Sequence, residues 1–413
     1  MLSRRAFLAA GAAAPLVCSA ATGAKAAPVA LKSITGGAVP ITADERRARV
    51  AKLQGLLREA KVGALLVEAG SSLDYFTGIQ WWRSERTTAA VIPATGDVVV
   101  VTPAFEEPSV RETLAIGGDV RTWNEHESPF ERIVQALKDR GVESGTVAVE
   151  STTRFFIVDG VRKASGKLEL VSGDAYVRAC RMVKSPAELA LMQVANDVVI
   201  RAIAHARDNI AKGMSSAEVN ALVSSAIAAL GGDDGGGLVL LNEASAYPHG
   251  SRQEQSVREG SIILLDCGCD VHGYKADISR TWVFGEPSAK QRKVWDTVKR
   301  GQEIALETAK VGVALGAIDD AVRAYYEREG WGPGYRLPGL SHRTGHGIGM
   351  EGHEPANLVH AEATKLAPGM CFSDEPGLYI PGEFGVRLED CWYMTEAGPK
   401  LFTPLAKSLD API

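Results

Sequence analysis

Five residues between positions 266 and 389 are of the types that bind divalent metal ions. They are spread over separate short segments: Asp266, Asp277, His346, Glu375 and Glu389. Carboxylates bridge metal ions readily and offset their charge, so four carboxylates and one imidazole suit two divalent cations. Two such cations a few ångströms apart share and activate one water molecule. The residue types therefore favour a two-metal hydrolase.

Each of these residues also has an ordinary structural explanation. Aspartates at strand ends and glutamates in turns are common at protein surfaces, and Glu375 precedes Pro-Gly, a turn-forming pair. Asp266 and Asp277, however, each follow an apolar strand pattern, and a carboxylate brought into a core requires a cation or a hydrogen-bonding partner. Glycines flank His346 and His353 and let the backbone approach a ligand closely. Metal binding is therefore the preferred interpretation.

The segments that carry these acids repeat within the chain. Gly260 precedes Asp266 by six residues, and Gly369 precedes Glu375 by six. Each glycine turn is predicted to lead into a strand that ends in an acid. A second acid, Asp277 or Glu389, follows in each case. We therefore expect two related halves, each of which supplies a strand-borne pair of carboxylates.

A separate domain is expected upstream of this region. Between Glu45 and Val177 helix and strand patterns alternate, which predicts an α/β domain. The sequence Ser185-Pro186-Ala187-Glu188 then combines an N-cap serine, a first-turn proline and a capping-box glutamate. We expect an N-terminal domain over residues 27–180 and an α+β catalytic domain over residues 181–413.

The first 26 residues have the features of a twin-arginine signal peptide. Arg4 and Arg5 precede a small apolar stretch at 8–17, and Ala24-Lys25-Ala26 resembles a cleavage site. The stretch is too short to span a bilayer, and the bulky Val17 disfavours lipoprotein cleavage at Cys18. We expect a periplasmic or secreted protein without a membrane anchor after processing. No later stretch is expected to be long and apolar enough to span a membrane.

The composition is that of a globular protein. Of 413 residues, 46% are hydrophobic and 23% are charged. The net charge is −5, which argues against nucleic acid as a partner, because phosphate binding needs a basic face. The five cysteines after residue 26 are odd in number and follow no disulfide pattern. Buried free thiols are favoured over a zinc-thiolate site.

The motifs of residues 181–413 together resemble the pita-bread metallopeptidases, in particular the prolidase and aminopeptidase P branch. The matching segments are R-M-V-K-S-P-A-E (181–188), P-H-G (248–250), L-L-D-C-G (264–268), A-D-I-S-R-T (276–281), H-R-T-G-H-G-I-G (342–349), G-H-E-P (352–355), D-E-P-G-L-Y (374–379) and G-V-R-L-E-D (385–390). The first domain resembles the creatinase-like N-terminal domain of that branch in size, α/β pattern and the segment D-Y-F-T-G (74–78). The resemblance implies a pita-bread domain with an internal pseudo-twofold repeat, and a homodimer.

The resemblance also implies a role for each metal-binding residue. Asp266 would bind one metal, Asp277 and Glu389 would bridge both, and His346 would be a ligand. Glu375 would be a ligand and the general base. His249 and His353 would be catalytic by contacting the substrate and stabilising the tetrahedral intermediate.

Further substrate-binding residues are expected around this centre. The candidates are Arg387, His249, His342, Trp81 and Trp82. Arg387 either pairs with one of the acids or clamps a substrate carboxylate or carbonyl, because a guanidinium suits bidentate recognition. The Trp81–Trp82 loop of the first domain either packs at the surface or closes over the outer end of the substrate.

The expected activity is hydrolysis of Xaa-Pro bonds in proline-containing peptides, of the Xaa-Pro aminopeptidase or Xaa-Pro dipeptidase (prolidase) type. Oxygen-rich ligands favour Mn²⁺, while Co²⁺, Zn²⁺ or Fe²⁺ would also fit. A metal-dependent lyase, or a phosphotriester or other amide hydrolase, remains open on the same fold. Less favoured are a creatinase-like amidinohydrolase, a methionine aminopeptidase and a non-catalytic metal-binding protein.

Overall fold

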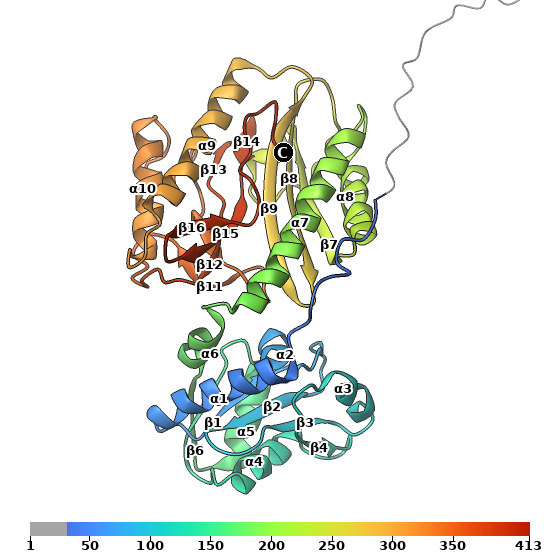
Figure 1. The fold of residues 1–413 in the computed structure, drawn as a ribbon, viewed down its shortest axis with the longest axis vertical. Coiled ribbons are helices and arrows are strands. Elements are labelled where there is room, and N and C mark those ends of the chain that lie inside the picture. Colours follow the sequence, from blue (N-terminus) through green and yellow to red (C-terminus); the bar gives the residue numbers. More distant parts are fainter. Residues whose placement is uncertain (1–30) are drawn as a thin grey trace, which may run out of the picture. The chain divides into compact units, whose positions relative to one another are not determined.

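The computed structural model of the chain describes residues 31–413. The twin-arginine motif, the cleavage site and Cys18 lie outside the described residues. The N-terminal domain contains one six-stranded sheet in the order β4-β3-β2-β1-β5-β6 (Figure 1). Its strands are β1 (Ala64–Glu68), β2 (Ala89–Pro93), β3 (Val99–Pro103), β4 (Asp119–Trp123), β5 (Gly145–Val149) and β6 (Leu168–Ser172). Its helices are α1 (Ala43–Glu59), α2 (Ser71–Thr77), α3 (Glu107–Thr113), α4 (Pro129–Asp139), α5 (Phe155–Ser165) and α6 (Asp174–Arg181).

The central strands of this sheet are mostly apolar, with Glu68 of β1 and Thr102 of β3 as polar exceptions. Every residue of β1, β2 and β3 is buried, as expected for strands without a solvent-facing side. Strand β1 pairs parallel with β5 and antiparallel with β2, so the sheet is mixed. The α/β character predicted for this part of the chain is confirmed.

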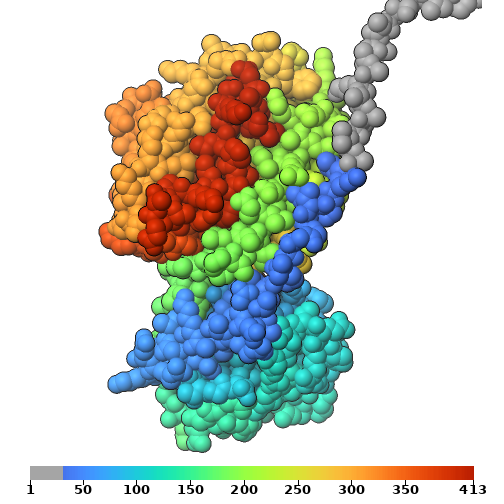
Figure 2. Space-filling view, in the orientation of Figure 1, coloured from blue at the N-terminus to red at the C-terminus, as the bar shows by residue number. Residues whose placement is uncertain are grey.

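The catalytic domain follows and is built from longer helices and several small sheets. Its helices are α7 (Pro186–Asn209), α8 (Ser216–Leu230), η1 (Asn242–Ala246), α9 (Ala289–Thr308) and α10 (Leu315–Arg328). Its strands are β7 (Asp233–Leu241), β8 (Ser261–Val271), β9 (Tyr274–Phe284), β10 (Gly345–Gly347), β11 (Glu354–Leu358), β12 (Cys371–Asp374), β13 (Gly377–Ile380), β14 (Phe384–Arg387), β15 (Asp390–Thr395) and β16 (Gly398–Leu401). In the space-filling view, the red C-terminal segment lies between the orange helices α9–α10 and the green helix α7 (Figure 2).

Two halves of similar element order make up this domain. Helices α7 and α8 precede the sheet β7-β8-β9, and helices α9 and α10 precede the sheet β11-β10-β12-β15-β16. Gly260 and Gly369 have positive φ angles of 75° and 85° just before β8 and β12, a conformation that glycine adopts without strain. The predicted glycine turns before the acid-bearing strands are therefore present in both halves.

Helix α7 begins as the sequence predicts. The side chain of Ser185 accepts from the backbone of Glu188, and the Glu188 side chain accepts in return from the Ser185 backbone, which completes a capping box. The expectation that no later stretch could span a membrane was wrong by length and composition, because α7 is long and apolar enough. Half of its most apolar window is nevertheless buried, and the helix packs against β8, β9 and α8. These contacts are those of a core helix.

Cysteine chemistry plays no visible part in holding the described residues together. The five cysteines of this part of the chain are free and buried. Cys267 and Cys269 both lie on β8, two residues apart and on the same side of the strand. Burial raises the pKa of the Cys269 thiol to about 12. The prediction of buried free thiols is confirmed for the described residues.

Candidate metal centre

The predicted metal-binding residues and most of the predicted substrate-binding residues line one cavity of the catalytic domain. The cavity measures about 390 Å³ and is lined by Pro248, His249, Asp266, Asp277, His342, Arg343, His346, His353, Glu375, Arg387 and Glu389. Pockets for small ligands measure about 300–1,000 Å³. The cavity is therefore large enough for a small ligand.

The hairpin β8–β9 supplies the two aspartates. Asp266 pairs with Ser279, and Asp277 pairs with Gly268, so the two aspartates are diagonal neighbours. Directly opposed residues of an antiparallel pair share one face of the sheet, which places both carboxylates on the cavity side. The prediction that Asp266 ends its strand was wrong, because β8 continues to Val271. The long hairpin carries both acids within its length.

The second half supplies the two glutamates beside a strand pair. Asp374 of β12 pairs with Asp390 of β15, so Glu375, just after β12, and Glu389, just before β15, emerge next to each other. The backbone N–H of Glu389 donates to Ser279 O at 3.0 Å, which joins the two halves at the site. Arg387 and Glu389 do not share a strand, because β14 ends at Arg387 and β15 begins at Asp390.

His346 faces the acids through one defined ring nitrogen. Its Nδ1 lies 3.0 Å from Gly347 O, and because a carbonyl oxygen only accepts, Nδ1 carries the proton. Its Nε2 lies 3.4 Å from Glu375 Oε1 and 3.8 Å from Asp277 Oδ2. Burial lowers the pKa of His346 to about 3, so the ring is neutral with a free lone pair at Nε2. This is the state in which histidine binds a metal.

The donor atoms are close enough to share cations. Two sets of three donors each lie within 4.8 Å of one another: His346, Glu375 and Glu389, and Asp266, Asp277 and Glu389. Burial, reinforced by the neighbouring carboxylates, raises the pKa of Asp277 and Glu389 well above the usual range. Glu389 Oε1 is buried and has no hydrogen-bond partner among the described residues. A buried acid of this kind needs a counter-charge, and the donor set fits divalent cations.

A hydrogen-bond network holds two of these acids in place. Ser279 Oγ donates to Glu389 Oε2 at 2.7 Å and accepts from Arg387 Nε at 3.1 Å. Arg387 Nη2 forms an ion pair with Asp266 Oδ2 at 2.5 Å. Arg387 was expected either to pair with one of the acids or to clamp a substrate group, and the structure contains the ion pair with Asp266. A direct role in substrate binding stays a prediction.

His342 reaches the cavity, but its ring nitrogens are already bonded. Its Nδ1 lies 2.8 Å from Arg343 O and its Nε2 2.7 Å from Tyr379 Oη. Burial lowers the pKa of His342 to about 3, so Nδ1–H donates to the carbonyl and Nε2 accepts from the tyrosine. Tyr379 Oη in turn accepts from Arg387 Nη1 at 3.0 Å. Tyr379 was not predicted as a site residue, and its place in the motif D-E-P-G-L-Y is the signal that could have indicated it.

The two other predicted histidines lie at the open side of the cavity. His249 and His353 are both exposed. The ring of His353 lies 4.0 Å from that of His346, between centroids. One donor atom of His353 also lies within 4.8 Å of donors of Asp277 and His346. His353 is therefore placed to contact either a substrate or a metal.

The turn that carries His353 is held by its neighbour Glu354. This buried carboxylate accepts from the backbone N–H of Met350 at 2.9 Å and of Glu351 at 3.2 Å. It also binds Arg181 Nη2 at 2.6 Å and Lys184 Nζ at 3.0 Å. Burial alone would raise the pKa of Glu354, but the two cations override it and lower the pKa to about 2.

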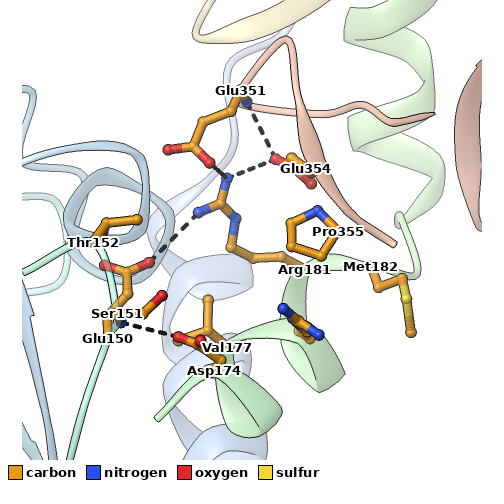
Figure 3. Close-up of a pocket in the computed structure, with 11 residues that line it drawn as sticks. Glu150, Ser151, Thr152, Asp174, Val177, Arg181, Met182, Glu351, Glu354 and Pro355 are labelled. Carbon is orange, nitrogen blue, oxygen red and sulfur yellow. Dashed lines mark hydrogen bonds and ion pairs between the residues drawn. The ribbon is translucent and has the colours of Figure 1, made fainter. Parts of the chain in front are cut away.

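Arg181 connects this turn to the N-terminal domain. Figure 3 shows its side chain between Glu150 on one side and Glu351 and Glu354 on the other. Its Nη1 donates to Ser72 Oγ at 2.9 Å and lies 4.0 Å from Glu150, while its Nη2 lies 3.5 Å from Glu351. The guanidinium of Arg181 therefore contacts residues of both domains, next to the turn that carries His353.

Trp81 and Trp82 are the two predicted site residues that do not line the cavity. Their rings stack on each other at 4.6 Å between centroids, and Trp82 is 67% exposed. These contacts match the surface interpretation of the loop. Closure over a substrate stays a prediction.

Comparison with known proteins finds a family match for each of the two domains. Residues 190–396, half of the chain, match metallopeptidase family M24, and residues 49–183 match the creatinase/prolidase N-terminal domain. The probable dipeptidase PepE of Mycobacterium tuberculosis is 30% identical over 85% of this chain and 92% of its own length. The Xaa-Pro dipeptidase of Lactobacillus helveticus is 29% identical over 87% of this chain and 97% of its own length.

A solved structure agrees with these matches. The crystal structure of dipeptidase PepE from Mycobacterium ulcerans superposes with a TM-score of 0.81 at 30% identity, over 89% of this chain and 97% of that one. The expected fold, a creatinase-like domain followed by a pita-bread domain, is confirmed, as is the resemblance on which it was based. The chain belongs to metallopeptidase family M24 and is a metal-dependent peptidase.

Proposed function

We propose that the enzyme hydrolyses Xaa-Pro peptide bonds with two divalent cations held by Asp266, Asp277, His346, Glu375 and Glu389. One observation carries the proposal: five metal-binding side chains line a single cavity, and Glu389 Oε1 is buried there without a partner among the described residues. The similarity to an Xaa-Pro dipeptidase supports the choice of bond. Four of the five ligands are oxygen donors, which favours manganese.

The cations, Glu375 and His353 have separate roles in the proposed hydrolysis. When bound, the two cations act as Lewis acids and lower the pKa of the attacking water. Glu375, which would also hold a cation, takes a proton from that water and delivers it to the proline nitrogen. His353, exposed in the cavity, donates to the carbonyl oxygen as negative charge develops there.

The test is hydrolysis of a panel of Xaa-Pro dipeptides and longer Xaa-Pro peptides by manganese-loaded protein, together with elemental analysis. We expect about two cations per chain and cleavage only before proline. Metal-loaded protein that cleaves none of the panel would redirect the search to a lyase, another hydrolase or a non-catalytic role on the same fold.

We further propose export by the twin-arginine route to the periplasm. The motivating residues are Arg4 and Arg5, which precede a weakly apolar stretch. Replacing both with lysine is expected to leave the precursor in the cytoplasm. Normal processing and periplasmic recovery of the double variant would contradict this route.

A homodimer is the proposed assembly. Trp82 and Phe105 are 67% and 61% exposed in the N-terminal domain, and aromatic side chains of this kind are enriched at protein interfaces. Light scattering on the purified protein is expected to give twice the chain mass. The double variant Trp82→Ser, Phe105→Ser tests whether these side chains contribute.

A further inference from the structure

His353 lies on a segment of the catalytic domain that has no regular secondary structure. Strand β10 ends at Gly347 and β11 begins at Glu354, and the residues between them form neither helix nor strand. The ring of His353 is exposed and lies 4.0 Å from that of His346, between centroids. A donor to a developing oxyanion is effective only when its position is fixed beforehand. The contacts that hold this segment therefore determine whether His353 can act as proposed.

A glutamate on each side of His353 leads to the N-terminal domain. Glu351, two residues before the histidine, accepts from Ser71 Oγ of helix α2 at 3.1 Å. Glu354, directly after the histidine, binds Nη2 of Arg181 at 2.6 Å, and Arg181 is the last residue of helix α6 in the N-terminal domain. The backbone that carries His353 is therefore held on both sides by residues of the other domain.

The guanidinium of Arg181 is anchored on its other side as well. Its Nη1 donates to Ser72 Oγ at 2.9 Å, and Ser72 Oγ donates to the buried Glu150 at 2.5 Å. Figure 3 shows Arg181 between Glu150 on one side and Glu354 on the other. The Arg181 side chain is only 7% exposed, and hydrogen bonds shielded from water in this way are stronger. A planar guanidinium makes both sets of contacts at once, which the single ammonium of a lysine does not.

Lys184 belongs to the same cluster but is anchored differently. Its Nζ also binds Glu354, at 3.0 Å, and its side chain is as buried as that of Arg181. Its backbone N–H, however, donates to Gly369 O of the catalytic domain at 2.9 Å. Lys184 therefore supplies charge to Glu354 from within the catalytic domain, whereas Arg181 adds the connection to Ser72.

We propose that Arg181 is a positioning residue for His353: it fixes the segment 348–354 against helix α2 and thereby sets where the histidine meets the substrate. The inference rests on the proposed function, in which His353 donates to the carbonyl oxygen, and it adds a role in turnover for the N-terminal domain. Because that donation strengthens as negative charge develops, loss of position lowers kcat and leaves KM nearly unchanged. The loss is at most that of His353→Ala.

The kinetic test compares Arg181→Lys and Ser72→Ala with the wild type, as manganese-loaded enzymes acting on Ala-Pro. Arg181→Lys keeps the positive charge beside Glu354 but loses the fork, and kcat is expected to fall about 10- to 100-fold, as after a small misplacement of a catalytic group. Ser72→Ala removes one hydrogen bond of the guanidinium, and kcat should fall about 2- to 10-fold. Ser128→Ala is the matched control, since it removes the N-cap of α4 in the same domain, and its kcat should equal that of the wild type.

A double-mutant cycle shows whether Arg181 acts through His353. In the His353→Ala background, Arg181→Lys is expected to change kcat by less than about twofold, because the group that it positions is gone. An equal loss in both backgrounds would mean that Arg181 affects activity by another route, such as stability or metal content, and overturns the proposal. Elemental analysis and melting temperatures on the same preparations identify that route.

Hydrogen exchange tests the position of the segment without any substrate. The backbone N–H groups of Met350 and Glu351 donate to Glu354 at 2.9 and 3.2 Å, so their exchange rates report how firmly that carboxylate is held. Exchange at both should be faster in Arg181→Lys and unchanged in the control. Unchanged exchange in Arg181→Lys overturns the positioning role. Faster exchange in a protein that hydrolyses no Xaa-Pro bond overturns the proposed activity instead and leaves the positioning of the segment standing.

Discussion

Two clusters of buried charge lie close together in the catalytic domain, and they are balanced in opposite ways. Around Glu354, one carboxylate meets two cations, Arg181 and Lys184, and its pKa falls to about 2. In the metal centre, carboxylates meet other carboxylates, and the pKa values of Asp277 and Glu389 rise well above normal.

The difference distinguishes a structural cluster from a ligand site. A balanced buried cluster is complete within the protein, so removal of one partner leaves an uncompensated charge. An unbalanced cluster destabilises the protein by itself and becomes favourable only with bound cations. Substitution of a carboxylate should therefore have opposite effects on stability in the two places.

Replacing Asp277 with asparagine is expected to have the largest effect. Because Asp277 is predicted to bridge both cations, the variant should lose both, and kcat should fall by about 10³-fold or more. After chelation, the variant should melt higher than chelated wild type, because one of several crowded buried carboxylates is gone. Elemental analysis, kinetics and calorimetry measure the three effects.

Asp320→Asn is the control for this substitution. Asp320 pairs with His360 at the surface, and its side chain is 52% exposed, so neither metal content nor activity should change. If Asp277→Asn retained two cations and full activity, the bridging role of Asp277 would be wrong.

Replacing Glu354 with glutamine is expected to destabilise the protein by about 3–5 kcal/mol, since Arg181 and Lys184 remain buried without a counter-charge. The metal content should be unchanged, because Glu354 does not line the cavity. Urea unfolding and elemental analysis measure both. Glu351→Gln is the matched control: Glu351 also faces Arg181, at 3.5 Å, but its side chain is 42% exposed. Equal losses in the two variants would contradict the comparison.

The two clusters also differ in how far the sequence could predict them. The metal ligands occur in short motifs whose residue types are unusual for their context, and the resemblance assigned each a role. The pair Arg181–Glu354 joins residues 173 positions apart, and no local pattern indicates that R-M-V-K and G-H-E-P meet. Both segments belong to the motifs of the family, but their contact depends on how the domains pack.

Two details of the site depended on tertiary structure in the same way. The apolar run before Asp266 predicts a strand, but its length is set by pairing with β9, so the acid lies within the strand. Arg387 was open to two interpretations because a sequence does not specify which acid lies nearby.

His353→Ala is expected to reduce kcat by about 10²–10³-fold, the size typical of removing one donor to a developing oxyanion. Both cations should remain, because the five proposed ligands complete the centre without His353. The structure also places a His353 donor atom within 4.8 Å of donors of Asp277 and His346. Loss of a cation would therefore make His353 a ligand, and an unchanged kcat with a lower melting temperature would make it a packing residue.

Acidification is expected to have the smallest effect of these changes. It should lower the stability of the folded protein gradually as the pH falls below neutral. The folded-state pKa of Glu354 is about 2 against an ordinary value of 4.5. Between these values the unfolded chain binds a proton that the folded protein does not, so stability falls as pH falls. The contribution of the Glu354 cluster is therefore fully present above pH 4.5 and is lost toward pH 2.

The stability difference between wild type and Glu354→Gln isolates this contribution. The free energy of unfolding also falls on acidification because of His342 and His346, whose pKa values are depressed to about 3. Both proteins contain these histidines, so their contribution cancels in the difference between wild type and variant. The difference should be constant above pH 4.5 and shrink progressively below it, because a protonated Glu354 carries no more charge than the glutamine that replaces it. Urea unfolding of metal-free protein at several pH values measures it. A difference that did not change with pH would mean that the carboxylate contributes through shape and hydrogen bonding rather than through its charge.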